Sequence, residues 1–148
     1  IMILKKNKHA IVPKRATSGS AGMDLCACID DDITVKCGEI KMIPTGIAIA
    51  MPSFDMGAFI FARSGLATKH GITLANSVGV VDSDYRGEIK VGIINLGTED
   101  YKIRNGDRIA QLVFMPVLNM NLVEVNSLEE TSRGEGGFGS TGKNAYKK

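Results

Sequence analysis

Turn signals recur about every 8–12 residues along most of this chain, and the segments between them have almost no helical periodicity. Asp30-Asp31-Asp32, Met51-Pro52-Ser53 and Asn105-Gly106 each separate two short apolar runs. Short strands at this spacing are typical of an all-β sandwich or barrel. From Ser127 the composition becomes polar and rich in glycine. We therefore predict a β domain over residues 1–126 and a separate C-terminal arm over residues 127–148.

The apolar runs predict a series of short strands and one helix. We expect strands at 2–4, 25–29, 33–35, 40–51, 57–62, 72–74, 101–104, 108–117 and 122–125, with a further brief one at 10–12. Pro44 and Gly46 should break the run 40–51. The helix is expected at Arg63–Gly71, where Ser64 can cap the first turn and Gly71 can end the helix.

Size and charge exclude several classes of protein. The chain has 148 residues and a net charge of +2, which fits one domain and argues against a basic nucleic-acid-binding protein. Tryptophan is absent, so the core must be aliphatic. No apolar run reaches the ~20 residues of a membrane span, so we expect no membrane partner. The apolar start Ile1–Leu4 ends at Lys5-Lys6, which does not suit a signal peptide.

The cysteines indicate a reducing compartment. There are three, Cys26, Cys28 and Cys37, and the only two histidines lie far apart in sequence, so no zinc spacing is present. We expect free thiols in a cytoplasmic protein, with Cys26 and Cys28 on one side of a strand.

The stretch Asn76–Val91 carries more chemistry than a turn needs. Two apolar runs, residues 77–81 and 89–93, flank Asp82-Ser83-Asp84-Tyr85-Arg86-Gly87, and a β-hairpin is the natural interpretation. A surface turn requires only Asp, Ser and Gly, so the added tyrosine and arginine suggest a site. Asp82 directly follows Val80-Val81, and partial desolvation there would make it a better base than a fully solvated acid. The alternative is an ordinary Asx-turn acid.

Three other polar positions have both a functional and a structural interpretation. Arg63-Ser64-Gly65 begins the predicted helix, where backbone N–H groups can bind an anion, although Ser64 alone suits a cap. Gln111 lies inside an apolar strand and alone suggests an outward or edge position. Asp24 follows a glycine turn and alone suggests a turn acid.

The arm contains motifs that fail in context. Gly134–Gly139 fits G-x-G-x-x-G, but it follows no predicted strand and opens no helix. Gly137–Lys143 begins like a phosphate-binding loop, but Asn144 stands where Ser or Thr should bind magnesium. An arm with arginine, glycine and an aromatic residue also suits single-stranded nucleic acid, which the low net charge disfavours.

The arm nevertheless has groups that suit a nucleotide. Glycine-rich backbone around Gly139 can wrap an anion with its N–H groups, and Arg133 offers a bidentate fork for a phosphate. Ser140 and Thr141 add hydroxyl donors, and Phe138 can stack on a base. A disordered, solvated tail is the usual alternative for a glycine-rich terminus.

Five stretches taken together resemble the motifs of trimeric dUTP pyrophosphatases (dUTPases). In chain order they are Ala21-Gly22-Met23-Asp24-Leu25, Arg63-Ser64-Gly65-Leu66-Ala67, Asn76–Val91, Gly106-Asp107-Arg108-Ile109-Ala110-Gln111-Leu112 and Arg133–Gly142. The resemblance implies a homotrimer of distorted jelly-roll or β-barrel subunits with shared active sites, in which a flexible C-terminal arm closes over a neighbour's site. It also implies hydrolysis of dUTP to dUMP and diphosphate, which lowers dUTP and supplies dUMP for thymidylate synthesis.

The resemblance assigns a role to each candidate residue. Asp82 would activate the water that attacks the α-phosphorus, and Tyr85 would pack on the deoxyribose and exclude a 2′-hydroxyl. The uracil would be read by Asn76 and by the backbone near Gly79 and Lys90. The phosphates would be bound by Arg63, Ser64, Gly65 and Gln111, and Asp24 would contact Mg2+ through water. On the arm, the γ-phosphate would be bound by Arg133, Ser140 and Thr141 with the backbone around Gly139. Phe138 would stack on uracil.

Two alternatives share the scaffold. A dCTP deaminase has the same fold and much of the same phosphate site, but it needs a glutamate base and a cytosine pocket. A non-enzymatic interaction protein on this scaffold would typically carry a long insertion, and the sequence has none.

Overall fold

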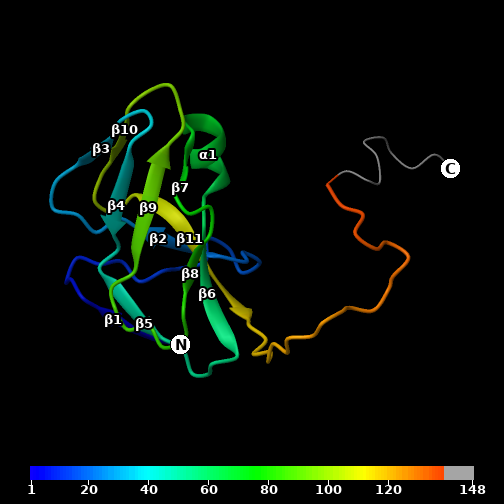
Figure 1. The fold of residues 1–148 in the computed structure, drawn as a ribbon. Coiled ribbons are helices and arrows are strands. Elements are labelled where there is room, and N and C mark those ends of the chain that lie inside the picture. The colour runs from blue at the N-terminus through cyan, green and yellow to red at the C-terminus, as the bar shows by residue number, and fades with distance from the viewer. Residues whose placement is uncertain (139–148) are drawn as a thin grey trace.

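A computed structural model describes the fold of residues 1–138 (Figure 1). Within these residues the elements are β1 (Met2–Lys5), β2 (Met23–Cys26), β3 (Ile33–Val35), β4 (Ile40–Pro44), β5 (Ile47–Ala50), β6 (Met56–Phe61), α1 (Ser64–His70), β7 (Ile72–Leu74), β8 (Gly79–Val81), β9 (Lys90–Asn95), β10 (Tyr101–Ile103) and β11 (Arg108–Pro116). The prediction of a mostly β fold with one short helix is confirmed. The predicted break between β4 and β5 is also confirmed, with Gly46 in the left-handed region at a φ of 68°.

The strands form four antiparallel sheets. A four-stranded sheet has the order β2-β11-β6-β8, and a three-stranded sheet has the order β4-β9-β7. Two-stranded sheets pair β1 with β5 and β3 with β10. The predicted strand at Ala10–Val12 is wrong, because these residues pair with no strand, and the next pairing along the chain is a single bridge between Lys14 and Asp24.

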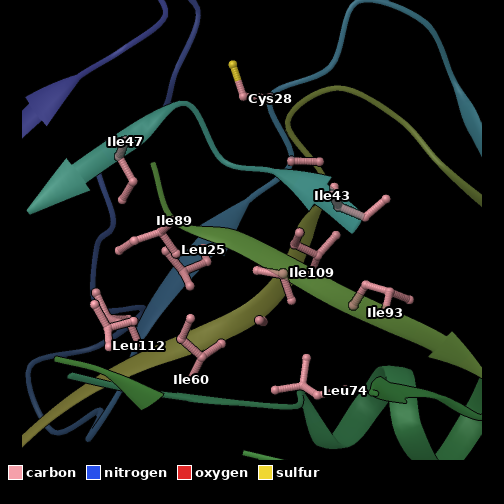
Figure 2. Close-up of a cluster of buried hydrophobic side chains, with 14 of the residues drawn as sticks. Leu25, Cys28, Ile43, Ile47, Ile60, Leu74, Ile89, Ile93, Ile109 and Leu112 are labelled. Carbon is pink, nitrogen blue, oxygen red and sulfur yellow. The ribbon is translucent and has the colours of Figure 1, made fainter. Parts of the chain in front are cut away.

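One aliphatic core joins the two larger sheets (Figure 2). Leu25 and Leu112 come from the four-stranded sheet and Ile43 and Ile93 from the three-stranded sheet, and all four are at most 1% exposed. Burial of one such side chain stabilises the fold by about 1.5–3 kcal/mol. The core is therefore aliphatic, as the absence of tryptophan predicts, and it packs the two larger sheets against each other.

Helix α1 joins β6 to β7 and ends as the sequence predicts. Gly71 adopts the left-handed conformation with a φ of 67°, and its N–H is directed to the carbonyl oxygens of Ala67 and Leu66. The predicted capping role of Ser64 is wrong, since Arg63 is the N-cap residue and no side chain caps the helix. Ser64 is instead the first helical residue, and it is exposed.

The predicted hairpin between residues 77–81 and 89–93 is also wrong. Strand β8 pairs with β6, where Val80 lies opposite Phe59. Strand β9 pairs with β4 and β7, where Val91 lies opposite Ile43 and Ile93 lies opposite Leu74. The two runs therefore belong to different sheets, and residues 82–89 connect the sheets.

Residues 117–138 form no strand or helix and leave the β domain after β11 (Figure 1). The predicted strand at Leu122–Val125 is wrong. Its side chains have the expected apolar character, but Leu122 is 97% and Val123 79% exposed, and no strand of the described chain lies beside them. A strand needs a hydrogen-bonding partner, and this segment has none within the described part of its own chain.

Candidate active site

A first hollow of about 320 Å³ lies where β6 runs into α1. It is lined by ten residues from four separate stretches of sequence, namely Ala16, Ser20, Ala21, Gly22, Asp24, Arg63, Ser64, Gly65, Arg108 and Gln111. The predicted phosphate-binding residues of the domain therefore do come together. We call this the anion hollow, because two arginines line it and its single carboxylate is already paired.

The carboxylate in the anion hollow is Asp24, which two arginines hold. The Nε of Arg63 lies 3.1 Å from Asp24 Oδ1, and the guanidinium of Arg108 lies 3.1 Å from Asp24 Oδ2. The Arg63 guanidinium also donates to the carbonyl oxygen of Arg108 at 3.0 Å. Asp24 thus fixes two cations at the wall of the hollow, where they favour an anion.

Gln111 is fixed in the anion hollow by its position on a central strand. Strand β11 lies between β2 and β6, with Gln111 opposite Asp24 on one side and Phe61 on the other. The edge-strand interpretation of Gln111 is therefore wrong. Its amide donates to the carbonyl oxygen of Ala62 at 2.9 Å. A Cβ at Gly22 would lie only 2.7 Å from Gln111 Oε1, so glycine there leaves room for the amide.

A second hollow, of about 430 Å³, lies between β8 and β9. It is lined by Met42, Ile60, Asn76, Gly79, Val80, Val81, Asp82, Tyr85, Glu88, Ile89 and Lys90. All the residues predicted to read the base and sugar are among them. Strand β8 is the edge strand of its sheet, and β9 enters the hollow at its first residue, Lys90. We call it the base hollow.

Tyr85 has a defined position in the base hollow. Its hydroxyl donates to the carbonyl oxygen of Glu88 at 3.0 Å, and its backbone N–H donates to the carbonyl oxygen of Asp82 at 3.1 Å. The ring lies against the backbone of Gly87, where a Cβ would be 2.3 Å from the Tyr85 hydroxyl oxygen. The ring remains 45% exposed, so it can contact a ligand.

Asp82 lies at the rim of the base hollow rather than inside it. Val81 before it is buried, but Asp82 itself is exposed, because β8 ends at Val81 and the chain turns outward. The desolvation expected from its apolar neighbours is therefore absent in the single chain. The carboxylate is instead accessible both to water and to a ligand.

The candidate residues form three groups that stay apart in one chain. The anion hollow and the base hollow share no lining residue. Arg133 and Phe138 lie on the arm, where Arg133 donates to the carbonyl oxygen of Gly136 at 2.8 Å and Phe138 is fully exposed. Figure 1 shows the arm running away from the domain. The predicted residues Gly139, Ser140 and Thr141 lie outside the described residues.

Two residues of these hollows, Arg108 and Glu88, have no role among the predictions made from the sequence. Arg108 pairs with Asp24, and the signal for it was its place three residues before Gln111 at the start of the same strand. Glu88 accepts a hydrogen bond from the backbone N–H of Gly46 at 2.8 Å. No sequence signal linked Glu88 to Gly46, because they lie 42 residues apart.

The three cysteines are unpaired, as predicted. Cys26 and Cys28 are both buried, although Cys28 lies beyond the end of β2. Burial raises the pKa of both thiols, helped by Asp24 for Cys26 and by Glu88 for Cys28. Within residues 1–138, no helix has the length and apolar character needed to cross a membrane.

Comparison with known proteins agrees with the geometry. The dUTPase family model matches residues 8–142. The deoxyuridine 5'-triphosphate nucleotidohydrolase of Desulfitobacterium hafniense is 54% identical over 96% of this chain and 94% of its own length. The Rickettsia canadensis protein of the same name is 58% identical over 93% of this chain and 92% of its own length.

Solved structures agree as well. A Staphylococcus bacteriophage 80alpha dUTPase with dUpNHpp has a TM-score of 0.86 and 25% identity, and covers 96% of this chain and 98% of its own. A mutant dUTPase of phage phi11, described with a structural Mg(II) ion, has a TM-score of 0.77 at 21% identity and supports the fold alone. The match of the family model over most of the chain confirms the prediction made from the five motifs: the chain belongs to the dUTPase family, the enzymes that hydrolyse dUTP.

Proposed function

We propose that the chain hydrolyses dUTP to dUMP and diphosphate by attack of water on the α-phosphorus, which lowers dUTP and supplies dUMP for thymidylate synthesis. The observation that carries the proposal is the base hollow, where Asp82 lies at the rim of a space lined by Asn76, Tyr85 and Lys90. A base at that rim can reach the phosphate next to the sugar, while the uracil lies deeper.

Asp82 is the proposed general base. Its exposed carboxylate accepts a proton from a water molecule and orients that water toward the α-phosphorus. General-base catalysis contributes about 10²–10⁴-fold to a rate. The reaction forms no covalent bond between substrate and protein, so positioning and charge neutralisation supply the remainder.

The base hollow is the proposed site for uracil and deoxyribose. Asn76 and the backbone near Gly79 and Lys90 offer hydrogen-bonding groups to the uracil edge. Gly79 lines the hollow without a side chain, and a Cβ there would approach Ile60 to 3.1 Å, which supports a wall made by the strand backbone. The extra methyl of thymine is worth only about 0.8 kcal/mol in transfer energy, and its rejection therefore needs such a steric wall. Tyr85 lies against the sugar and excludes a 2′-hydroxyl.

The anion hollow is the proposed site for phosphates. Arg63 and Arg108 supply positive charge, and Gln111, Ser64 and the backbone of Gly65 supply donors. Arg108 joins the predicted set on the strength of its ion pair with Asp24.

Mg2+ is the proposed cofactor, held mainly by the substrate phosphates. Residues 1–138 contain no group of three His, Cys, Asp or Glu side chains that could cage a metal. Asp24 fits an outer-sphere role, because each of its oxygens pairs with one arginine and keeps a further lone pair for a metal-bound water. When bound, Mg2+ neutralises charge on the phosphates.

A homotrimer is the proposed assembly, with each site made by more than one chain. Two observations support it. The two hollows and the arm lie apart in one chain, so a complete site would need residues from more than one chain, and an apolar surface lies beside β8. A hollow of about 710 Å³ there includes Phe54, Val80 and Val117, of which Phe54 is 72% and Val80 63% exposed. The arm then closes over a neighbour's site, with Arg133, Ser140, Thr141 and the backbone around Gly139 on the γ-phosphate and Phe138 on uracil. The free cysteines support a cytoplasmic location.

Hydrolysis in H2(18)O tests the proposal. Attack on the α-phosphorus places the label in dUMP, and label in diphosphate instead would contradict it. The rate should fall in EDTA, and UTP and dTTP should compete weakly. The same assay with dCTP addresses the deaminase alternative, which requires release of ammonia.

A further inference from the structure

Tyr85 is held in place by two residues that have no role in the proposed function, Gly87 and Glu88. Its hydroxyl donates to the main-chain oxygen of Glu88, three residues further on, at 3.0 Å. The ring lies against Gly87, which has no side chain to displace it. The position of the ring therefore depends on where the segment Gly87–Glu88 lies.

That segment is tied to the turn between β4 and β5. The N–H of Gly46 donates to Glu88 Oε1 at 2.8 Å. The buried hydroxyl of Thr45 donates to the carbonyl oxygen of Ile89 at 2.5 Å, and the N–H of Ile89 donates to the carbonyl oxygen of Ile47 at 2.8 Å. The residues on both sides of the turn thus hold the end of the 82–89 connection.

Of these three hydrogen bonds, only the one to Glu88 involves a side chain of the 82–89 connection. Glu88 is half-buried, and its charge acts on the neighbouring Cys28 thiol, whose Sγ lies 2.8 Å from the Cβ position of Gly46. The carboxylate therefore lies in a confined place over the turn. Glu88 therefore has two links to the position of Tyr85. Its carboxylate anchors the segment to Gly46, and its carbonyl oxygen accepts the hydrogen bond from the Tyr85 hydroxyl.

We propose that Glu88 is a positioning residue which, by anchoring the 82–89 connection to Gly46, fixes the Tyr85 ring as the gate against ribonucleotides. This inference rests on the proposed role of Tyr85 at the sugar. Without the anchor the ring can withdraw from the base hollow, and the space for a 2′-hydroxyl opens. Discrimination between dUTP and UTP is then lost more than the rate with dUTP.

The test compares kcat/KM for dUTP and UTP in the full-length chain. Glu88→Ala removes the acceptor and should lower the dUTP-to-UTP ratio about tenfold, chiefly by raising kcat/KM for UTP. Glu88→Gln keeps the Oε1 acceptor and should keep most of the ratio. Gly87→Ala displaces the Tyr85 ring directly and should lower the ratio without touching the carboxylate, which keeps a second variant available if Glu88→Ala does not fold.

Glu39→Ala is the matched control. Glu39 also accepts a turn N–H, from Lys36 at 2.9 Å, but it lines neither hollow, so its loss should leave the ratio unchanged. A wild-type ratio in folded Glu88→Ala would overturn the role of Glu88, and a wild-type ratio in folded Gly87→Ala would overturn the dependence of the Tyr85 gate on this segment; neither result would affect dUTP hydrolysis itself. Absence of dUTP hydrolysis in the wild-type chain would instead overturn the proposed function.

Discussion

Gln111 on β11 lies directly opposite Asp24 on β2 in the four-stranded sheet. Two motifs 87 positions apart in sequence thereby meet at one wall of the anion hollow. Gly22, two residues before Asp24, lies against the Gln111 side chain, and a Cβ there would come within 2.7 Å of Oε1. The register of this strand pair therefore places both polar groups, and the glycine lets them coexist.

Gly22→Ala should lower kcat/KM for dUTP about tenfold, because the added methyl moves the Gln111 amide from the anion hollow. Tenfold corresponds to about 1.4 kcal/mol of transition-state stabilisation. Steady-state kinetics and the thermal midpoint measure the effect. Gly19→Ala is the control, since nothing lies within 4 Å of a Cβ at that position. Equal kinetics for the two variants would contradict the packing argument.

The three thiols should differ in reactivity. Burial raises the pKa of Cys26 and Cys28, and a raised pKa leaves less of the reactive thiolate at any given pH. Cys37 is exposed. We expect one fast thiol per chain with a disulfide reagent at pH 8 and three after unfolding, and the buried pair should become reactive only as the pH rises further. In Cys37→Ser the fast reaction should disappear, and its persistence would contradict the assignment.

Local patterns predicted the strands better than their partners. The runs at Ile33–Val35 and Ile72–Leu74 fall where the composition indicates, and so does the end of α1 at Gly71. The hairpin prediction failed because pairing of β8 with β6 depends on tertiary packing that two adjacent apolar runs do not reveal. Leu122–Val125 has strand composition, but the described chain provides no partner for it.

The candidate site was predictable as a set of residues but not as a geometry. The sequence motifs identified Asp24, Arg63 and Gln111, and the structure places all three in the anion hollow. Arg108 lies in the same motif as Gln111, but its ion pair with the distant Asp24 was not evident from the sequence. No local pattern linked Glu88 to Gly46.

Mixing two inactive chains tests whether sites are shared. One chain carries Asp82→Asn and lacks the base, and the other ends at residue 132 and lacks the part of the arm from Arg133 onward. If the arm serves a neighbour, co-expressed chains carrying two different tags should regain activity, in roughly a quarter of sites for random association. If each arm serves its own chain, the mixed oligomers stay inactive.

The role of Asp82 is tested most directly by the turnover of dUTP by Asp82→Asn. The substitution keeps the shape of the side chain and removes its ability to accept the proton, so kcat should fall about 10²–10⁴-fold with an unchanged thermal midpoint. Asp84→Asn, which changes an exposed acid of the same connection, should retain most of the activity. Wild-type turnover by folded Asp82→Asn would contradict the account.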